Sequence, residues 1–347
     1  MASCQEMAPD TGTGRLSVVI FDAQGPVTRA SDVTELSYEK QINNLQLFIF
    51  EGSTLFKYEL ITDGLSGETI QRTYEAIKAG LYSVYAVANA SDLSGISSEE
   101  ELVETAVSLS ECRLDASSGF VMAGSATTNV GSGGSETVAV LLRRFAARVR
   151  LVSVENQLSA SYAGGGQVKI EAVYLANALG TWNLGGTETA TGWVNLGGRA
   201  AGKEASTQRD DYIATQAQVN PAAYAAQVFR AQDVTVQRGD TQSFTDCCLY
   251  SFPNPVTEDH TGNTATQSTG ALTRLVVLAT VNGSSWWYPV TLFRDGKGIE
   301  RNTSYDVRLT LRATGSDDPN EPVGKGALTA TVSVAPWLEG AEYTETI

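Results

Sequence analysis

The sequence predicts an all-β protein with minor helices, organised as two β-sandwich domains. Most segments alternate apolar and polar residues with the two-residue period of strands. These segments are short and are separated by turn residues such as Gly296-Lys297-Gly298, which favours sandwiches over a parallel α/β sheet. The length of 347 residues corresponds to about two domains of ordinary size.

The strands of the first half follow from this alternation. We expect them at residues 16–21, 42–50, 82–87 and 137–154. In the last of these, one face carries the apolar odd positions Leu141, Phe145, Ala147, Val149 and Leu151, and the even positions carry Arg144, Arg148 and Arg150. This arginine row predicts either an anion site or a solvated face paired with acids, and the negative overall charge favours the solvated face.

Helices are expected only as small insertions. Ser97 stands three residues before Glu100, which is the spacing of a capping box, and a helical apolar pattern follows. Residues 68–78 are a candidate for a second helix that ends before Gly80.

The second half continues the strand pattern. Strands are expected at residues 168–176, 272–281, 285–293, 305–312 and 327–334. Gly164-Gly165-Gly166 interrupts the pattern, so we place the domain boundary there. The predicted organisation is a tether with a first strand at 1–29, a first sandwich at 30–163, a second sandwich at 164–326 and a tail at 327–347.

Composition argues against several classes of function. With 24 basic and 39 acidic residues the net charge is −15, so the chain would repel nucleic acids and anionic lipid head groups. No apolar run reaches the roughly 20 residues of a membrane helix. One histidine, His260, and four cysteines without a CxxC pair argue against a metal site, and Cys112, Cys247 and Cys248 are predicted as small buried residues. No acid–base set can be assembled, so we expect no enzyme activity and no cofactor.

Two polar segments carry partial ligand-binding motifs. Residues 197–203 (GGRAAGK) have the spacing of a phosphate-binding loop, but Glu204 replaces the required Ser or Thr, so we expect a flexible surface loop. Asp317, Asp318 and Glu321 lack the spacing of a calcium loop and predict a solvated acidic turn.

The N-terminal end suggests processing. Cys4 heads a polar tether at residues 5–14, which fits either the processed end of a lipoprotein or an ordinary free cysteine. Arg29 lies in a polar, turn-rich loop after the first strand, which is either a protease site or a plain loop.

The C-terminal tail starts with a clean alternating strand. One face of this strand carries Leu328, Ala330, Val332 and Val334. The acidic, Gly/Pro-rich residues 315–326 before it are predicted as a flexible linker. The strand therefore pairs either with its own subunit or with a neighbouring subunit.

Five stretches of the chain form a recognisable set. They are GLYSVYAVAN at 80–89, RRFAARVRL at 143–151, CLYSFPNP at 248–255, IERNTSYDVRLTLRATGSDDP at 299–319 and VSVAPW at 332–337. Together they resemble the fimbrillin family, the lipoprotein-derived pilins of Bacteroidales type V pili. The resemblance spans nearly the whole chain and implies two sandwiches of transthyretin-like, Greek-key type.

The resemblance implies a processed precursor. The precursor would be exported by a signal, would carry palmitate on Cys4, and would contact the outer membrane only through that lipid. The sequence as given begins without a signal or a full lipobox, so Cys4 is assigned as the lipid site on its position alone. An arginine-specific protease would then cut between Arg29 and Ala30.

The resemblance also implies polymerisation by donor-strand exchange. Cleavage would remove the first strand, and the C-terminal strand of another subunit would fill the groove. The residues of the removable strand that face this groove are Leu16, Val18 and Ile20. The matching donor residues are Leu328, Ala330, Val332 and Val334.

The function expected on these grounds is that of a stalk subunit in a cell-surface fimbrium. It would form a homopolymer that supports adhesion and biofilm, with candidate ligands on host or bacterial surfaces. The alternative is a tip or accessory adhesin that binds carbohydrate or protein. An exposed aromatic patch around Trp182, Trp193 or Trp286 would favour this alternative.

Overall fold

The computed structural model describes residues 12–22, 37–39, 41–65, 69–112, 119–162, 166–186, 191–220, 224, 228–324, 326–337 and 344–346. The chain divides into two compact units. Unit 1 comprises residues 1–26, 35–105 and 111–144, and unit 2 comprises residues 27–34, 106–110 and 145–347. The last division falls between Arg144 and Phe145, earlier in the chain than the boundary predicted after residue 163. No helix among the described residues is long and apolar enough to cross a membrane.

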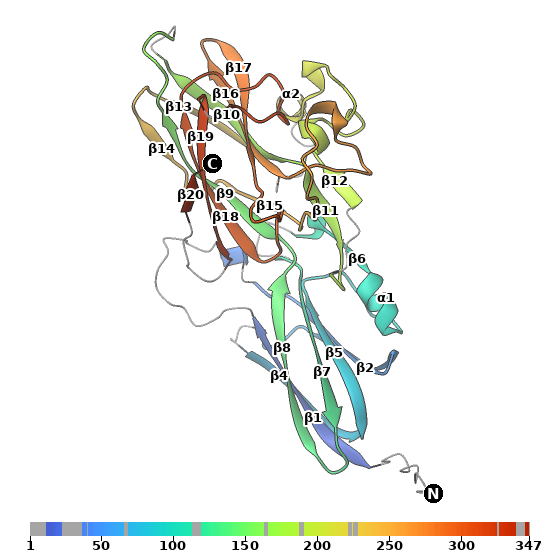
Figure 1. Cartoon of the computed structure of the whole chain (residues 1–347). Helices are drawn as coiled ribbons and strands as arrows, with labels where there is room; N and C mark the ends of the chain where they lie inside the picture. Colours follow the sequence, from blue (N-terminus) through green and yellow to red (C-terminus); the bar gives the residue numbers. More distant parts are fainter. Residues whose placement is uncertain are drawn as a thin grey trace, which may run out of the picture. The chain divides into compact units, whose positions relative to one another are not determined.

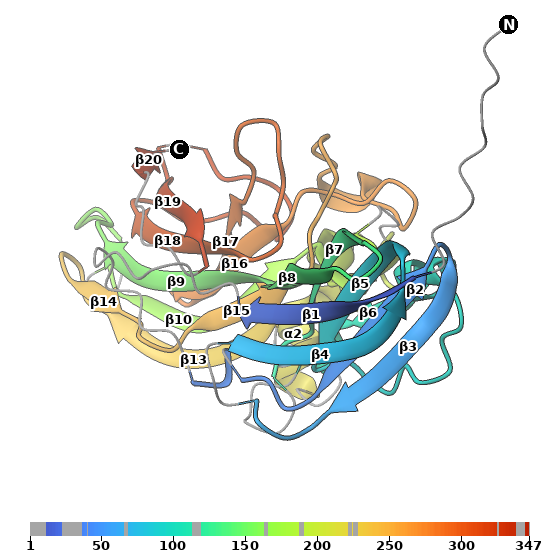
Figure 2. The same cartoon turned by 90° about the horizontal axis from the view of Figure 1, so that it is seen from below.

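In the described residues of unit 1, seven strands lie in the order β3-β2-β5-β7-β8-β1-β4 (Figures 1 and 2). Their bounds are β1 (Thr13–Asp22), β2 (Leu45–Glu51), β3 (Thr54–Ile61), β4 (Thr69–Lys78), β5 (Gly80–Ala88), β7 (Met122–Val130) and β8 (Ser135–Arg144). One hydrophobic core takes side chains from all seven strands. The strands therefore enclose this core as the layers of a β-sandwich.

Strand β4 occupies the segment that was a candidate for a second helix, so that expectation is wrong. Ile70 and Ile77 are seven residues apart, which is a helical spacing, and both are buried. The pairing with β1 shifts register between Gly14 and Leu16, and Ala76 has a φ of 56°. This β-bulge turns the strand so that both isoleucines face the same core.

The long strand predicted at residues 137–154 is in fact two strands. β8 ends at Arg144, and β9 (Ala147–Asn156) begins in unit 2. Because of the break, the buried residues of β8 are even-numbered, whereas the buried apolar residues at the start of β9 are odd-numbered. In β8, Val140 is buried whereas Leu141 is 42% exposed. Val149 is buried in β9, as predicted.

The predicted arginine row is not a solvated face. The side chains of Arg144 and Arg148 are fully buried. The Arg144 Nε donates to the carbonyl of Glu39 at 2.7 Å. Arg150 forms a two-point contact with the Asp306 carboxylate, at 2.8 and 2.6 Å. Backbone and carboxylate oxygens therefore compensate these buried charges.

The predicted helix after Ser97 is present as α1 (Glu99–Glu104), one residue later than expected. Its N-cap is Ser98, whose side chain accepts from the backbone N–H of Glu101. The Glu101 carboxylate in turn accepts from the backbone N–H of Ser97 at 2.8 Å. A second short helix, α2 (Ile213–Val219), lies in unit 2 and was not predicted.

The described residues of unit 2 form three sheets (Figure 1). Their strand orders are β13-β10-β16-β17, β12-β11-β6, and β14-β9-β18-β19-β20, with β15 paired to β9. The bounds are β6 (Ala106–Ser108), β10 (Val168–Ala176), β11 (Ala178–Asn183), β12 (Thr191–Val194), β13 (Phe229–Val236), β14 (Thr241–Ser243), β15 (Cys248–Ser251), β16 (Arg274–Val281), β17 (Ser284–Thr291), β18 (Thr303–Leu311), β19 (Leu328–Pro336) and β20 (Thr344–Thr346). The described part of the chain is therefore mostly strand, as predicted.

Candidate functional site

The first strand of the chain lies between two other strands of unit 1. β1 runs parallel to β8 on one side and antiparallel to β4 on the other (Figure 2). Val18, for example, is paired with Val138 of β8 and with Arg72 of β4. Both edges of β1 are therefore engaged in ladder pairing, and β1 fills a slot, here called the β1 groove, between β8 and β4.

The side chains expected to face this groove do so. Leu16 and Val18 are 0% exposed and Ile20 is 1% exposed, and all three belong to the unit 1 core. Full burial of one such side chain contributes about 1.5–3 kcal/mol, so the three contribute on the order of 5–9 kcal/mol. The first strand is thus a principal part of the core and not a surface attachment.

The start of β1 is held by the turn at residues 131–134 between β7 and β8. The Arg15 backbone N–H donates to the Gly134 carbonyl at 2.9 Å, and the Gly133 N–H donates to the Thr13 carbonyl at 2.8 Å. Arg15 also donates from its side chain to Glu75 at 2.7 Å, but this contact is exposed and adds little stability.

Strand β4 depends on β1. In the strand order of the described residues, β4 stands at the end and its ladder partner is β1. Loss of β1 would leave β4 without that partner and would expose one edge of β8. An unpaired edge and an open apolar slot together form a template for an incoming strand.

The predicted donor strand is docked in its own unit. β19 pairs with β18 along its full length, from Leu328–Leu311 to Pro336–Thr303, and with β20 on its other side. Leu328, Ala330 and Val332 are 7, 5 and 7% exposed. The fourth predicted donor residue, Val334, is half-buried.

The end of β19 is anchored by an aromatic side chain. Trp337 is buried and its ring stacks on Tyr250, with ring centroids 5.7 Å apart. The Arg148 guanidinium carbon lies 5.4 Å from the centroid of the Trp337 ring. The tail therefore contributes to the packing of unit 2 in the monomer.

The first half of the predicted linker at residues 315–326 is not a flexible linker. Ser316 forms a β-bridge with Trp287, and Asp318 and Asn320 are buried. Only from Glu321 onward is the segment mainly exposed. The tail is therefore attached to unit 2 at Asn320 and not at Gly315.

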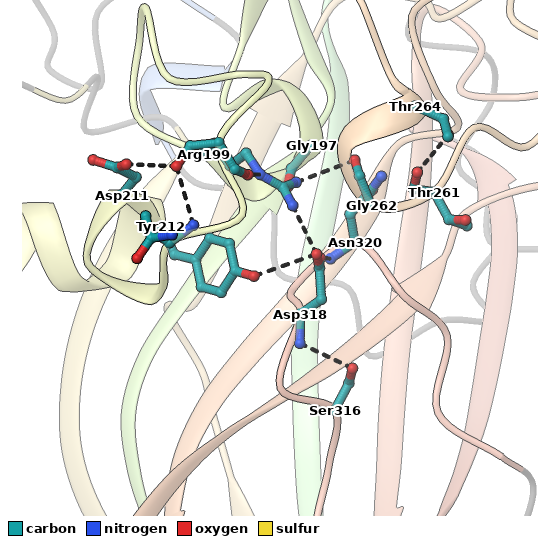
Figure 3. A network of polar contacts seen from close by, with 12 residues as sticks. Gly197, Arg199, Asp211, Tyr212, Thr261, Gly262, Thr264, Ser316, Asp318 and Asn320 are labelled. Atoms are coloured by element: carbon teal, nitrogen blue, oxygen red, sulfur yellow. Dashed lines mark hydrogen bonds and ion pairs between the residues drawn. The ribbon is translucent and has the colours of Figure 1, made fainter.

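A buried ion pair fixes this attachment (Figure 3). The Arg199 Nη2 lies 2.7 Å from the Asp318 Oδ2, and the Arg199 side chain is 1% exposed. Arg199 also donates to the carbonyls of Gly197 and Ser206 at 2.5 Å and of Gly262 at 3.1 Å. One guanidinium thus ties together three backbone segments and the acidic turn.

The Asp318 carboxylate is engaged on both oxygens. Its Oδ1 accepts from the Asn320 backbone N–H at 2.7 Å, and its Oδ2 accepts from the Tyr212 hydroxyl at 3.4 Å as well as from Arg199 (Figure 3). The Asn320 side chain donates to the His260 carbonyl and accepts from Arg274. This network is a structural clamp that joins the acidic turn to several loops of unit 2.

Two predictions about these loops need correction. In residues 197–203, Gly197, Gly198 and Arg199 are buried, and only residues 201–203 form the expected surface loop. In the acidic turn, Asp317 and Glu321 are exposed as predicted, but Asp318 is buried because it pairs with Arg199. The partner of Arg199 is distant in sequence, so no local pattern indicated the pair.

The remaining predicted residues fall into two groups. Cys4, Arg29 and Ala30 lie outside the described residues. The candidate aromatic patch is incomplete because Trp182 is buried, whereas Trp193 and Trp286 are half-buried. Cys112, Cys247 and Cys248 are buried, as predicted.

Comparison with known proteins gives this architecture a context. A family model described as the major fimbrial subunit protein (FimA) matches residues 15–189, which is just over half of the chain. The match includes β1 from Arg15 onward and both strands that flank the β1 groove, β4 and β8. A search of the curated proteins found no match.

Solved structures show the same fold. A fimbrilin (FimA) of Porphyromonas gingivalis W83 has a TM-score of 0.62 and 15% identity, covering 93% of this chain and 97% of that one. The tip fimbrial protein Mfa3 of the same species has a TM-score of 0.55 and 12% identity, covering 93% and 99%. A protein of Parabacteroides distasonis, solved as a candidate cell adhesion protein, has a TM-score of 0.63 and 19% identity, covering 96% and 100%.

The two-sandwich architecture and these matches define a class, that of fimbrial subunits of the cell surface. Within it, the chain belongs to the major fimbrial subunit (FimA) family. The fimbrillin resemblance and the predicted β-sandwich fold are thereby confirmed. Family membership implies that the protein assembles with other fimbrial subunits at the cell surface.

Proposed function

We propose that this protein is a stalk subunit that polymerises by strand exchange once its first strand has been removed. The observation that carries the proposal is the position of β1, which is paired on both edges and supplies three core residues. A subunit that loses such a strand keeps an apolar slot with two open edges, and a strand from a neighbour satisfies both.

The proposed processing site is the bond between Arg29 and Ala30. β1 ends at Asp22, so a cut after Arg29 severs the whole of β1 from the rest of the chain. The lipid proposed for Cys4 belongs to the removed piece. One cleavage by an arginine-specific protease therefore both releases the subunit from the outer membrane and frees the β1 groove.

The proposed donor is β19 of another subunit. In its own unit Leu328, Ala330 and Val332 keep 5–7% exposure, whereas the equivalent residues of β1 are 0–1% exposed. In the groove a strand gains full-length pairing on both edges, whereas β20 pairs with only part of β19. Deeper burial and a second complete ladder favour the exchange.

A stalk position fits better than a tip position. The chain combines a removable first strand with a tail that ends in a strand, which is what an internal subunit needs. The alternative adhesin role is weakened because Trp182 is buried and does not contribute to an exposed aromatic patch.

The test is assembly of the purified precursor after treatment with an arginine-specific protease. We expect ladders of subunits on a denaturing gel without boiling, and we expect none when residues 327–347 are deleted. Ladders from the deleted protein would contradict the proposal. The deletion also removes Trp337 from the packing of unit 2, so unfolding followed by tryptophan fluorescence must show that unit 2 remains folded.

A point substitution gives a milder second comparison. Val332→Asp places a carboxylate on the face that would enter the groove, and Thr331→Asp places the same charge on the opposite face. We expect Val332→Asp to shorten the polymers more than Thr331→Asp. Val332 is 7% exposed in its own unit, so Val332→Asp also lowers the stability of the monomer, and its unfolding must be measured alongside.

A further inference from the structure

Two segments at opposite ends of the chain share a sequence pattern. Residues 12–20 read GTGRLSVVI, and residues 324–332 read GKGALTATV. Both have glycine at the first and third positions and leucine at the fifth, followed by Ser or Thr, a small aliphatic residue, and Ile or Val at the end. The first segment enters β1 and the second enters β19.

In β1, steric contacts require glycine at the third position of this pattern, Gly14. A Cβ on Gly14 would lie 2.7 Å from the Gly131 carbonyl oxygen and from Val130 Cγ1, and 2.8 Å from the Gly134 carbonyl oxygen. Two of these atoms are backbone atoms of a tight turn, which cannot move easily. Only glycine therefore fits where the strand passes the turn at residues 131–134.

In the tail, no steric contact requires glycine at the matching position, Gly326. A Cβ on Gly326 would meet no other atom within 4 Å in the described part of the chain, and the same holds for Gly324. Gly326 is exposed in its own unit. The packing of the monomer therefore does not require glycine here.

We propose that β19 of a second copy of this chain enters the β1 groove in the register of β1, with Gly326 in the place of Gly14. This inference rests on the proposed function and specifies its partner and register. Leu328, Ala330 and Val332 then take the places of Leu16, Val18 and Ile20. The Ala327 backbone N–H replaces that of Arg15 as the donor to the Gly134 carbonyl.

The fit of the side chains agrees with this register. Leu328 equals Leu16 in size, whereas Ala330 and Val332 are smaller than Val18 and Ile20, so the donor enters without overpacking the core. The other strand-like part of the tail fits less well. Its alternating face, Tyr343-Glu345-Ile347, would bring a carboxylate into the apolar groove.

The first test is a steric one. Gly326→Val adds a side chain that the monomer accommodates, so the unfolding midpoint of the precursor should not fall. In the groove that side chain would collide with the turn at 131–134, so ladder formation after cleavage should fall at least tenfold in rate. Ala327→Arg is the matched control because it places a larger side chain where Arg15 stands exposed beside Glu75, and it should assemble like the parent.

The second test reads the register directly. Val19 of β1 is paired with Gln71 of β4, and its equivalent in the donor is Thr331. Cleaved Thr331→Cys subunits mixed with cleaved Gln71→Cys subunits should form a disulfide between copies. Thr329→Cys and Ser333→Cys should not do so with Gln71→Cys, because two residues along a strand displace the Cα by roughly 7 Å, beyond disulfide reach. The native cysteines 112, 247 and 248 are buried, and Cys4 leaves with the first strand.

The outcomes separate this inference from the proposed function. If deletion of 327–347 abolishes ladders but Gly326→Val assembles like the parent, or the cross-link forms at 329 or 333, the register is wrong while strand exchange stands. If deletion of 338–347 alone abolishes ladders in a folded monomer, the donor is the last strand and the inference falls. If the complete deletion leaves ladders intact, strand exchange by the tail itself is excluded.

Discussion

Arg199 and Asp318 are separated by 119 residues in the sequence, and their charged groups meet at 2.7 Å in the interior of unit 2. The contact joins the loop at residues 197–206 to the segment from which the tail departs. It therefore fixes the position in unit 2 from which the chain leaves toward β19.

Loss of this ion pair should destabilise unit 2 strongly. Asp318→Ala leaves the Arg199 guanidinium buried without its carboxylate, which should cost about 3–5 kcal/mol of unfolding free energy. All five tryptophans lie in unit 2, so urea unfolding followed by tryptophan fluorescence reports this unit. Glu300→Ala, which removes the exposed contact with Lys297, is the control and should have a much smaller effect. Equal midpoints for the two variants would contradict the clamp.

A core substitution in the first strand should affect the precursor and not the polymer. Ile20→Ala removes buried methyl and methylene groups, so the precursor should lose about 2–5 kcal/mol in unit 1. Val19→Ala, at a half-buried position, should cost less. Calorimetry of the two precursors checks the difference.

The same variant offers a check on the fate of the strand. If processing removes residue 20, the subunits that assemble from Ile20→Ala precursor have the parental sequence. Their polymers should then melt at the parental temperature. A lower melting temperature would mean that the first strand stays in the polymer.

Cleavage should depend on one arginine. Mild trypsin treatment of the precursor should yield a fragment whose N-terminal residue is Ala30, while the two units resist. Arg29→Ala should remove this fragment and abolish ladders, and N-terminal sequencing identifies the product. Arg15→Ala is the control, because Arg15 lies within β1 and is protected there by ladder pairing. An unchanged fragment from Arg29→Ala would place the site elsewhere.

Stability should fall in mildly alkaline solution. Burial raises the pKa of the Cys112 thiol and of the Tyr305 hydroxyl to about 12 each. The ordinary values are about 8.5 and 10, so between these values and about 12 the unfolded chain has lost protons that the folded chain keeps. The free energy of unfolding should therefore decrease as the pH rises above about 8.5. Urea midpoints at pH 7.5 and 10 measure the decrease, and Cys112→Ala should make it smaller.

Strand positions were predictable where one face is buried and the other is not. In β1 the residues Leu16, Val18 and Ile20 are apolar because they face the core, and Val19 between them is half-buried on the opposite face. β10 was also located to the residue, although its burial alternates only over the first four positions and both faces are buried from Ala172 onward. β4 was missed because a bulge at Ala76 converts a strand into a pattern with helical spacing.

The buried charges could not have been predicted from local sequence. Arg144 is satisfied by the carbonyl of Glu39, a backbone atom that any residue could supply. Arg199 and Asp318 meet only because the fold brings two loops together. From local sequence an arginine is expected to be exposed to solvent, and only its partner in the tertiary structure determines whether it is buried. The likeness of the two glycine-containing ends, in contrast, was visible in the sequence, but its meaning depends on the turn beside Gly14.

The double pairing of β1 has a mechanical consequence. In the proposed polymer, the strand that fills the β1 groove links two subunits and carries the tension between them along its own axis. The hydrogen bonds of a β ladder lie across that axis, so tension loads the bonds to β8 and to β4 at the same time, in shear. They must fail together, whereas a strand pulled sideways from a sheet edge releases its bonds one after another. A slot with two walls therefore gives the junction far greater tensile strength than docking on a single edge would provide.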